Sequence, residues 1–199
     1  MIDILRAADR ELFLLLNGIH GETADAFMLA ATDTKFWLPV HLFFIYMLFK
    51  KLDNRAWLAL VAIGLAVLLS DQLTSSLLKP LTERLRPSHN PEFEGTIHLV
   101  KNHTGDYYRG GKFGFPSSHA ANAFAVATLL WLLIGRRFRW TLLTFAVATL
   151  IGYTRIYLGV HYPGDVIAGA LLGSSIGWIC WKLYRYIRER MHSPVPAAD

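Results

Sequence analysis

Residues 56–78 read AWLALVAIGLAVLLSDQLTSSLL and indicate the class of this protein. A helix needs roughly 20 mostly apolar residues to cross the hydrocarbon core of a bilayer, and this segment reaches that length with one ionisable residue, Asp71. A carboxylate near the end of a span is either a functional group, paired here with Lys79 or Arg155, or a group already at the level of the lipid headgroups. The segment predicts a transmembrane helix in an integral membrane protein.

Further apolar runs lie on both sides of this segment, in a chain of 199 residues of which 53% are hydrophobic. Three runs are continuous: 120–134, 140–153 and 166–181. Residues 23–49 are also apolar but are interrupted by Asp33, Thr34 and Lys35, so they form either one kinked passage or a re-entrant piece followed by a short span. We expect an all-α integral membrane bundle of about five to six transmembrane helices.

The first residues, 2–17, carry too many charges to cross a bilayer. Their apolar side chains can share one helical face: Ile2, Leu5, Leu12, Phe13 and Leu16. This pattern is typical of an amphipathic helix that lies in the membrane interface.

Two features of the last apolar run concern packing. Gly169, Gly173 and Gly177 recur at every fourth position, which allows another helix to approach closely. The single cysteine, Cys180, lies in the same run and is expected to be a small buried apolar residue.

The formal net charge of +5 could suggest a nucleic-acid partner, but the basic residues cluster at the ends of apolar runs, where they anchor spans at the membrane surface. Those on one side of the predicted spans are Lys50, Lys51, Arg55, Arg136, Arg137, Arg139, Lys182, Arg185, Arg188 and Arg190. By the positive-inside rule that side is cytoplasmic. We expect a multi-pass protein of the cytoplasmic (inner) membrane with no nucleic-acid partner.

Residues 154–165, TRIYLGVHYPGD, place Arg155, His161 and Asp165 in a short polar turn between two apolar runs. A carboxylate beside an imidazole can hold the proton of one ring nitrogen and leave the other nitrogen free to attack. Asp165 could also cap the helix that follows Pro163, and both roles can hold at once. An arginine beside this pair supplies a fork for an anion.

A second polar segment is residues 79–87, with the sequence KPLTERLRP. It lies with residues 154–165 on the outer side of the predicted bundle, opposite the basic ends of the spans. It contributes Lys79 and Arg86, which together with Arg155 give three permanent cations with few acids among them. Such a group suits a phosphate, which needs both positive charge and many hydrogen-bond donors.

The third polar segment on that side is FPSSH, residues 115–119. Proline followed by Ser117 and Ser118 is a helix-start signature, and the free N–H groups of such a start favour an anion. His119 lies in this first turn, where the helix dipole disfavours the imidazolium, so a proton on His119 is readily donated to a leaving group.

Together these segments resemble the signature motifs of the type 2 phosphatidic acid phosphatase (PAP2) superfamily. The matching residues are Lys79 with Arg86 and Pro87 (K-x6-R-P), PSSH at 116–119, and Arg155, His161 and Asp165 (R-x5-H-x3-D). They occur in the family's order, and the resemblance covers about residues 70–177. It departs at Ser118, where the family usually has glycine, and at Thr154, where it usually has serine. The first departure bears on how tightly a phosphate packs there.

The resemblance implies a mechanism. His161 attacks phosphorus and forms a phosphohistidine, Asp165 orients His161, and His119 protonates the leaving group. The residues that hold the phosphate oxygens are Lys79, Arg86, Arg155, Ser117 and the Ser118 amide. Neither a metal nor another cofactor is implied. Residues 1–191 are expected to form one domain, followed by a flexible tail at 192–199.

The implied substrate is a lipid whose phosphate or diphosphate reaches a site facing the periplasm or the cell exterior. Undecaprenyl diphosphate, phosphatidate, phosphatidylglycerol phosphate and lipid A phosphates all fit, and an isoprenyl diphosphate is slightly favoured. A vanadate-dependent haloperoxidase shares these motifs, but the membrane spans argue against it. The sequence is also compatible with a phosphatase of soluble esters and with a non-catalytic lipid-binding protein.

The long polar segment 88–115 is typical of a lid or a binding loop. Its histidines, His89, His98 and His103, lack tight spacing and are expected to be solvated rather than metal-bound. Arg109 and Lys112 could bind a second phosphate, which would favour diphosphate substrates. The aromatic residues of this segment either contact a lipid chain or belong to the interfacial aromatic belt: Tyr107, Tyr108, Phe113 and Phe115.

Overall fold

A computed structural model describes residues 2–135 and 139–191, and within these ranges the chain is helical with no β-strand. The helices are α1 (Ile2–Asn17), α2 (Glu22–Thr32), α3 (Leu38–Leu52), α4 (Ala56–Asp71), α5 (Lys79–Thr82), α6 (Ser118–Leu130), α7 (Leu143–Tyr157) and α8 (Pro163–Arg190). Single turns of 3₁₀ helix occur at Thr34–Trp37, Asp53–Arg55, Pro87–His89, Pro91–Phe93 and Arg139–Leu142. The all-α prediction is confirmed. The basic residues 136 and 137 and the expected tail at 192–199 lie outside the described residues.

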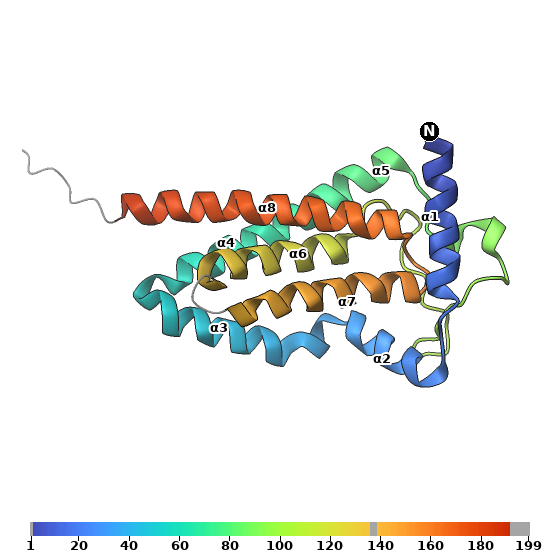
Figure 1. The fold of residues 1–199 in the computed structure, drawn as a ribbon, viewed down its shortest axis with the longest axis horizontal. Coiled ribbons are helices and arrows are strands. Elements are labelled where there is room, and N and C mark those ends of the chain that lie inside the picture. The colour runs from blue at the N-terminus through green and yellow to red at the C-terminus, as the bar shows by residue number, and fades with distance from the viewer. Residues whose placement is uncertain (1, 136–138, 192–199) are drawn as a thin grey trace, which may run out of the picture.

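Within the described residues, three helices are long and apolar enough to cross a membrane. They are Ala56–Thr82, which joins α4 to α5 through a π-helical segment at Gln72–Leu78, then Ser118–Gly135, which extends α6, and Pro163–Arg190, which is α8. Helices α3 and α7 run beside them in the same bundle (Figure 1). The chain is a multi-pass membrane protein.

The close approach of α6 to α8 depends on small residues. A Cβ atom at Gly173 would lie 2.0 Å from the Ala121 carbonyl oxygen, and one at Gly177 would lie 2.6 Å from that of Ala125. Gly169 meets the Ser117 carbonyl in the same way. The expectation that these glycines allow close helix contact is confirmed, and the contact fixes the start of α6 against the start of α8.

The interior of the bundle is built from small and aliphatic side chains of α3, α4, α6 and α8. Leu48, Ala59, Ala125 and Leu129 are completely buried there, and Cys180 packs among them with 2% exposure. The prediction that Cys180 is a buried apolar residue is confirmed.

Residues 23–49 form two helices that follow one another along the bundle. Helix α2 ends at Thr32, a 3₁₀ turn follows at Thr34–Trp37, and α3 continues in the same general direction (Figure 1). The Asp33 carboxylate caps this turn by accepting a hydrogen bond from the backbone N–H of Lys35 at 2.9 Å. The apolar segment is thus two helices with a kink at residues 33–37.

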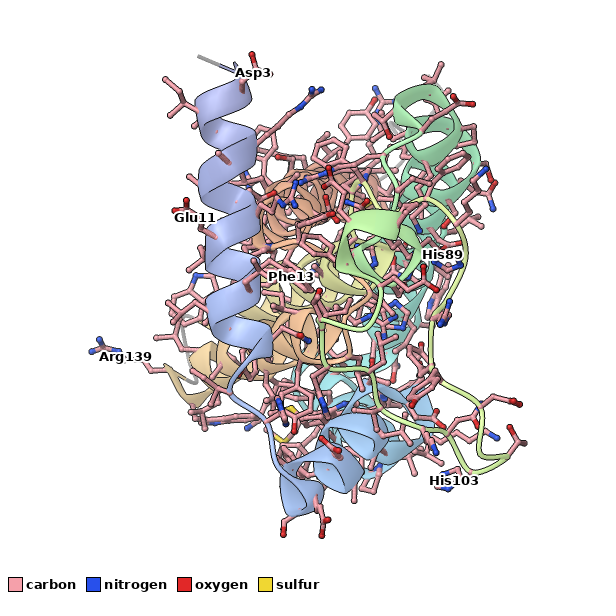
Figure 2. The ribbon with its side chains drawn as sticks, turned by 90° about the vertical axis from the view of Figure 1, so that its right-hand side faces the viewer. Asp3, Glu11, Phe13, His89, His103 and Arg139 are labelled. Atoms are coloured by element: carbon pink, nitrogen blue, oxygen red, sulfur yellow. The ribbon has the colours of Figure 1, made fainter. Side chains whose placement is uncertain are left out.

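Helix α1 lies across one end of the bundle, transverse to α8 (Figure 1). Phe13 points from it into the protein, whereas Glu11 points away (Figure 2). The predicted helix is present, and only part of its expected apolar face is buried. Phe13 and Leu16 pack against the bundle, while Leu5 and Leu12 are exposed.

Candidate active site

His161 and Asp165 lie together at the end of the bundle that α1 covers. Both are buried, with 1% and 0% of the residue exposed, and His161 Nδ1 is 3.3 Å from Asp165 Oδ2. The same carboxylate oxygen accepts the Tyr162 backbone N–H at 3.0 Å and so caps the start of α8. Asp165 therefore occupies both positions that the sequence left open, beside the imidazole and at the helix cap.

The pKa of His161 lies well below its usual value. Burial is the largest cause, and the cations of Arg86, Arg155, Lys79 and Arg84 add to it. The imidazole is therefore neutral near pH 7, and Asp165 at Nδ1 leaves Nε2 as the nitrogen that can act as a nucleophile.

Lys79 and Ser118 connect two of the three polar segments. The Lys79 ammonium donates to the Ser118 hydroxyl at 2.6 Å, and the Thr74 hydroxyl donates to the same oxygen at 2.9 Å. Ser75 lies 3.0 Å from Ser118 and 3.3 Å from Asp71, to which its hydroxyl donates. Asp71 thus reaches Lys79 through Ser75, and the described residues contain no ion pair between Asp71 and either Lys79 or Arg155.

Arg86 is buried beneath the loop that follows it in sequence. Its Nε donates to the Phe113 carbonyl at 3.1 Å, and its backbone N–H donates to the Lys112 carbonyl at 3.1 Å. Gly110 lies against the guanidinium, because a Cβ there would be 2.5 Å from Nη1. Burial, with the charge of Arg155 next, lowers the pKa of Arg86 to about 10, so the group stays cationic near pH 7.

Arg155 is 1% exposed and extends from α7. Its Nη1 donates to the Thr32 hydroxyl at the end of α2 and to the Tyr108 hydroxyl at 3.1 Å, while its Nε has no partner within the described residues. An unpartnered donor on a buried cation is available to an anion. Tyr108, expected only as a lipid or belt contact, instead positions this arginine.

The start of α6 supplies the remaining predicted residues. Ser117 is the N-cap, and its hydroxyl accepts the Ala120 N–H at 3.4 Å. The Ser117 N–H donates to the Asp165 carbonyl at 2.9 Å, so this amide is already engaged. Ser118 and His119 begin the first turn, whose N–H groups have no partner within the helix. His119 is half-buried and within electrostatic range of Arg155, His161 and Arg86.

The structure brings every predicted site residue to this one end of the bundle, and it adds two residues to which the sequence analysis gave no role. Arg84 Nη1 donates to Asp165 Oδ1 at 2.7 Å, and its Nη2 donates to Asp9 Oδ2 at 2.6 Å. Arg84 was visible in KPLTERLRP as a third cation, but its partners are distant in sequence. Asp9, on α1, carried no signal for the site.

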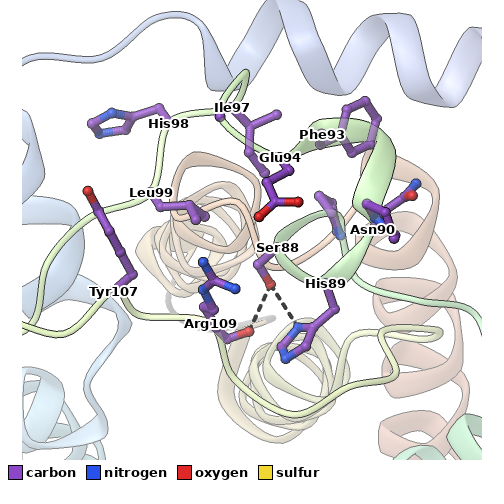
Figure 3. A pocket seen from close by; sticks show the side chains of 13 residues that line it. Ser88, His89, Asn90, Phe93, Glu94, Ile97, His98, Leu99, Tyr107 and Arg109 are labelled. Atoms are coloured by element: carbon purple, nitrogen blue, oxygen red, sulfur yellow. Dashed lines mark hydrogen bonds between the residues drawn. The ribbon is translucent and has the colours of Figure 1, made fainter.

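The segment 88–115 forms a separate cavity beside Arg86, with a volume of about 500 Å³. Figure 3 shows Glu94 and Arg109 pointing into it from opposite sides. Ser88 is one of the lining residues. Its hydroxyl donates to the Arg109 carbonyl at 2.9 Å and lies 3.2 Å from His89 Nδ1. Burial lowers the pKa of His89, and the nearby cations, Arg86 first, add to the effect. The cavity therefore presents neutral, acidic and basic polar groups together.

The other loop histidines have different surroundings. His98 Nε2 is 2.8 Å from Asp25 and its ring stacks on His20, whereas His103 is exposed. Within residues 2–135 and 139–191, no three His, Cys, Asp or Glu side chains are grouped so that they could hold a metal ion. His98 is therefore a packed residue rather than the solvated one that the sequence predicted.

A family model described as the PAP2 superfamily matches residues 55–189. Two similar relatives are both named lipid A 4'-phosphatase. The one from Bacteroides thetaiotaomicron is 40% identical over 98% of this chain and 85% of its own length. The one from Porphyromonas gingivalis is 37% identical over 95% of this chain and 78% of its own length.

The fold also matches a solved structure, a transmembrane PAP2-type phosphatidylglycerolphosphate phosphatase from Bacillus subtilis. The TM-score is 0.62 at 23% identity, over 94% of this chain and 88% of that one. These matches confirm the resemblance seen in the three motifs and the expected class of enzyme, a membrane lipid phosphatase. The chain belongs to the PAP2 superfamily.

Proposed function

We propose that this chain hydrolyses a phosphate ester of a membrane lipid through a phosphohistidine at His161. The observation that supports it is the pairing of His161 with Asp165 among three cations, Lys79, Arg86 and Arg155. A site that only bound lipid phosphate would need the cations but neither the neutral imidazole nor its carboxylate partner.

In the proposed first step, His161 Nε2 attacks phosphorus, the new P–N bond forms and the P–O bond to the lipid breaks. His119 gives its proton to the departing oxygen. In the second step, His119 takes a proton from water, the water oxygen attacks phosphorus, and the P–N bond breaks to release inorganic phosphate. The two histidines thus have complementary roles as nucleophile and general acid–base.

The cations would stabilise the equatorial oxygens of the transferring phosphoryl group, whose charge must be balanced in the transition state. Arg155 offers its unpartnered Nε, and the first turn of α6 offers its backbone N–H groups, including that of Ser118. Ser117 can contribute its hydroxyl proton, since its oxygen accepts rather than donates in the cap. This arrangement would supply the positive charge from the protein alone.

For the substrate, we propose a lipid whose phosphate is carried on a polar headgroup, with the 4'-phosphate of lipid A as the first candidate. Two observations favour it over the isoprenyl diphosphate preferred from sequence: the names of the two relatives, and the polar cavity beside Arg86. A cavity of that size lies within the range of ligand sites. An isoprenyl diphosphate remains the second candidate, with Arg109 as the residue that would meet a second phosphate.

We further propose that residues 1–191 form one domain with five spans, α3 and α7 crossing beside the three long helices, and that α1 lies in the interface. The site would face the periplasm or the cell exterior. In support, Lys50 and Lys51 end α3, and Arg188 and Arg190 end α8, at the end of the bundle away from α1 (Figure 1). The positive-inside rule assigns that end to the cytoplasm.

The test is release of inorganic phosphate in detergent with EDTA, from lipid A, undecaprenyl diphosphate and phosphatidate. Wild type is compared with His161→Ala and with the matched control His103→Ala, which changes an exposed loop histidine. We expect release by wild type and the control, fastest from lipid A, and a loss of about 10³-fold or more in His161→Ala. Equal turnover by His161→Ala would refute the phosphohistidine, and no turnover by folded wild type would refute the enzyme.

A further inference from the structure

We infer that Arg84 and Asp9 are positioning residues for the nucleophile. The position of helix α1 on the bundle therefore controls the geometry of the His161–Asp165 pair. The inference rests on the proposed role of His161. It follows from a continuous chain of contacts that runs from α1 to the imidazole and joins residues from three separate parts of the sequence.

The first link is the way in which the Asp165 carboxylate is held. Its contact with His161, at 3.3 Å, is longer than its hydrogen bond from Arg84, at 2.7 Å, or that from the Tyr162 N–H, at 3.0 Å. The two shorter bonds therefore set the plane of the carboxylate and decide which oxygen faces the imidazole. A fully buried carboxylate also needs a cation partner to remain ionised, and Arg84 is the one that touches it.

The second link is the way in which Arg84 is held. One terminal nitrogen bonds Asp165 and the other bonds Asp9, and the guanidinium lies over the Tyr162 ring at 4.2 Å from its centroid. Two carboxylates on the two nitrogens of a planar group leave it no freedom to turn. A lysine could not reproduce this arrangement, because its ammonium is a compact point charge without a fork.

The third link fixes Asp9 to the helix that carries Asp165. Asp9 Oδ1 accepts the Gly164 N–H, in the first turn of α8, at 2.6 Å. A Cβ at Gly164 would lie 2.8 Å from the Asp9 carboxylate, so a larger residue there would displace this side chain from the N–H. Asp9 thereby bridges α1, Arg84 and α8.

Several contacts hold helix α1 on the protein, so a displacement of this helix would also displace Asp9 and, through it, Arg84. Its Asn17 side chain donates to the Tyr157 carbonyl at 2.8 Å and accepts the His98 N–H at 2.8 Å, and Phe13 is completely buried. The helix also exposes Ile4, Leu5 and Leu15, with 73%, 64% and 65% of each residue accessible. A helix that is held to the protein by buried contacts and still exposes apolar side chains would lie against lipid at this end of the bundle.

The experiment compares kcat, KM and the pH profile of kcat/KM for Arg84→Gln, Arg84→Lys, Asp9→Asn and the double variant Arg84→Gln/Asp9→Asn. The matched control is Arg10→Gln, which removes the exposed Arg10–Glu92 ion pair from the neighbouring position on α1. Folding is followed by elution in detergent, and phosphate release from the best wild-type lipid is the readout.

We expect Arg84→Gln to lower kcat by about 10- to 100-fold, with KM within about twofold, because small misplacements of reacting groups cost rates of this size. Arg84→Lys should recover only part of the loss. Asp9→Asn should lower kcat less than Arg84→Gln, and the double variant should resemble Arg84→Gln alone, because Asp9 acts through Arg84.

The acid limb of the profile should move to higher pH in Arg84→Gln, because one of the cations that oppose a proton on His161 is lost. The other groups that face His161 are Arg86, Lys79, Arg155, His119 and Asp165. An Arg84→Gln variant with wild-type kcat and an unmoved limb would overturn the inference, as would additive losses in the double variant. An active His161→Ala would instead overturn the proposed function.

Discussion

The ammonium of Lys79 donates a hydrogen bond to the hydroxyl of Ser118 over 2.6 Å, and this contact joins the first polar segment to the start of α6. Ser118 stands where the superfamily usually has glycine. In this chain the extra hydroxyl does not obstruct the site, because it lies among Thr74, Ser75 and Lys79. The serine thus holds a cation in place.

Replacing Ser118 tests this role. Ser118→Ala should lower kcat/KM by about fivefold, since a hydrogen bond to a charged group contributes about 1.5 kcal/mol or more and part of that is recovered by water. Ser76→Ala is the control, because Ser76 lies on the same π-helical segment but is exposed and bonds Gln72. Full activity in Ser118→Ala would show that Lys79 does not depend on this contact.

Tyr108 offers a second prediction, on the 88–115 loop. Tyr108→Phe removes the hydroxyl that accepts from Arg155 Nη1 at 3.1 Å but keeps the ring, which the guanidinium approaches to 5.3 Å. We expect KM for the lipid to rise about two- to tenfold through looser positioning of the cation, as loss of one hydrogen bond at a charged group predicts. Tyr186→Phe, at an exposed tyrosine near the end of α8, should match wild type. Unchanged kinetics in Tyr108→Phe would assign the loop tyrosine to packing alone.

The pH dependence follows from the low pKa of His161. The nucleophile must be neutral, so activity requires a pH above the folded pKa of this imidazole, and burial has moved that pKa well below 6.5. We expect kcat/KM to persist below pH 6.5 and to decline only at lower pH. Arg86→Gln should move this decline to higher pH, because it removes the cation that opposes protonation of His161 most strongly. A decline centred at pH 6.5 or above in wild type would contradict the prediction.

Helix packing gives a prediction about stability. Gly173→Ala places a Cβ within 2.0 Å of the Ala121 carbonyl, and overpacking of this kind costs about 1–3 kcal/mol. The thermal unfolding midpoint in detergent should fall. Gly64→Ala is the matched control, since Gly64 lies within α4 with no described neighbour inside 4 Å of the added atom, and alanine is the better helix former. An unchanged midpoint in Gly173→Ala would mean that α6 and α8 can separate at little cost.

The orientation of the bundle can be tested with single cysteines in a Cys180→Ala background. Cysteine at His103, on the exposed loop beside the site, should react with an impermeant thiol reagent in intact cells, whereas cysteine at Met191, exposed after α8, should react only after lysis. The reverse pattern of labelling would invert the proposed topology.

Much of the fold was predictable from the sequence because its signals are local. The apolar runs at 56–78 and 120–134 predicted two helices of membrane-spanning length, and the glycine repeat predicted a close helix contact, which the structure shows to be with α6. The last helix was predicted as the apolar run 166–181, but it spans Pro163–Arg190, because the helix begins at its proline and capping carboxylate and continues into its basic end.

The site, like the fold, has a part that was predictable from the sequence and a part that was not. Sequence by itself predicted which cations, which two histidines and which carboxylate form the proposed site, through three short motifs that resemble those of the superfamily. The tertiary structure alone decided what holds them. Arg84 meets Asp9 across 75 positions, Arg155 meets Thr32 across 123, and neither pairing has a sequence signature. Such contacts form only when helices remote in the chain are packed against one another, and their partners become known only with that packing.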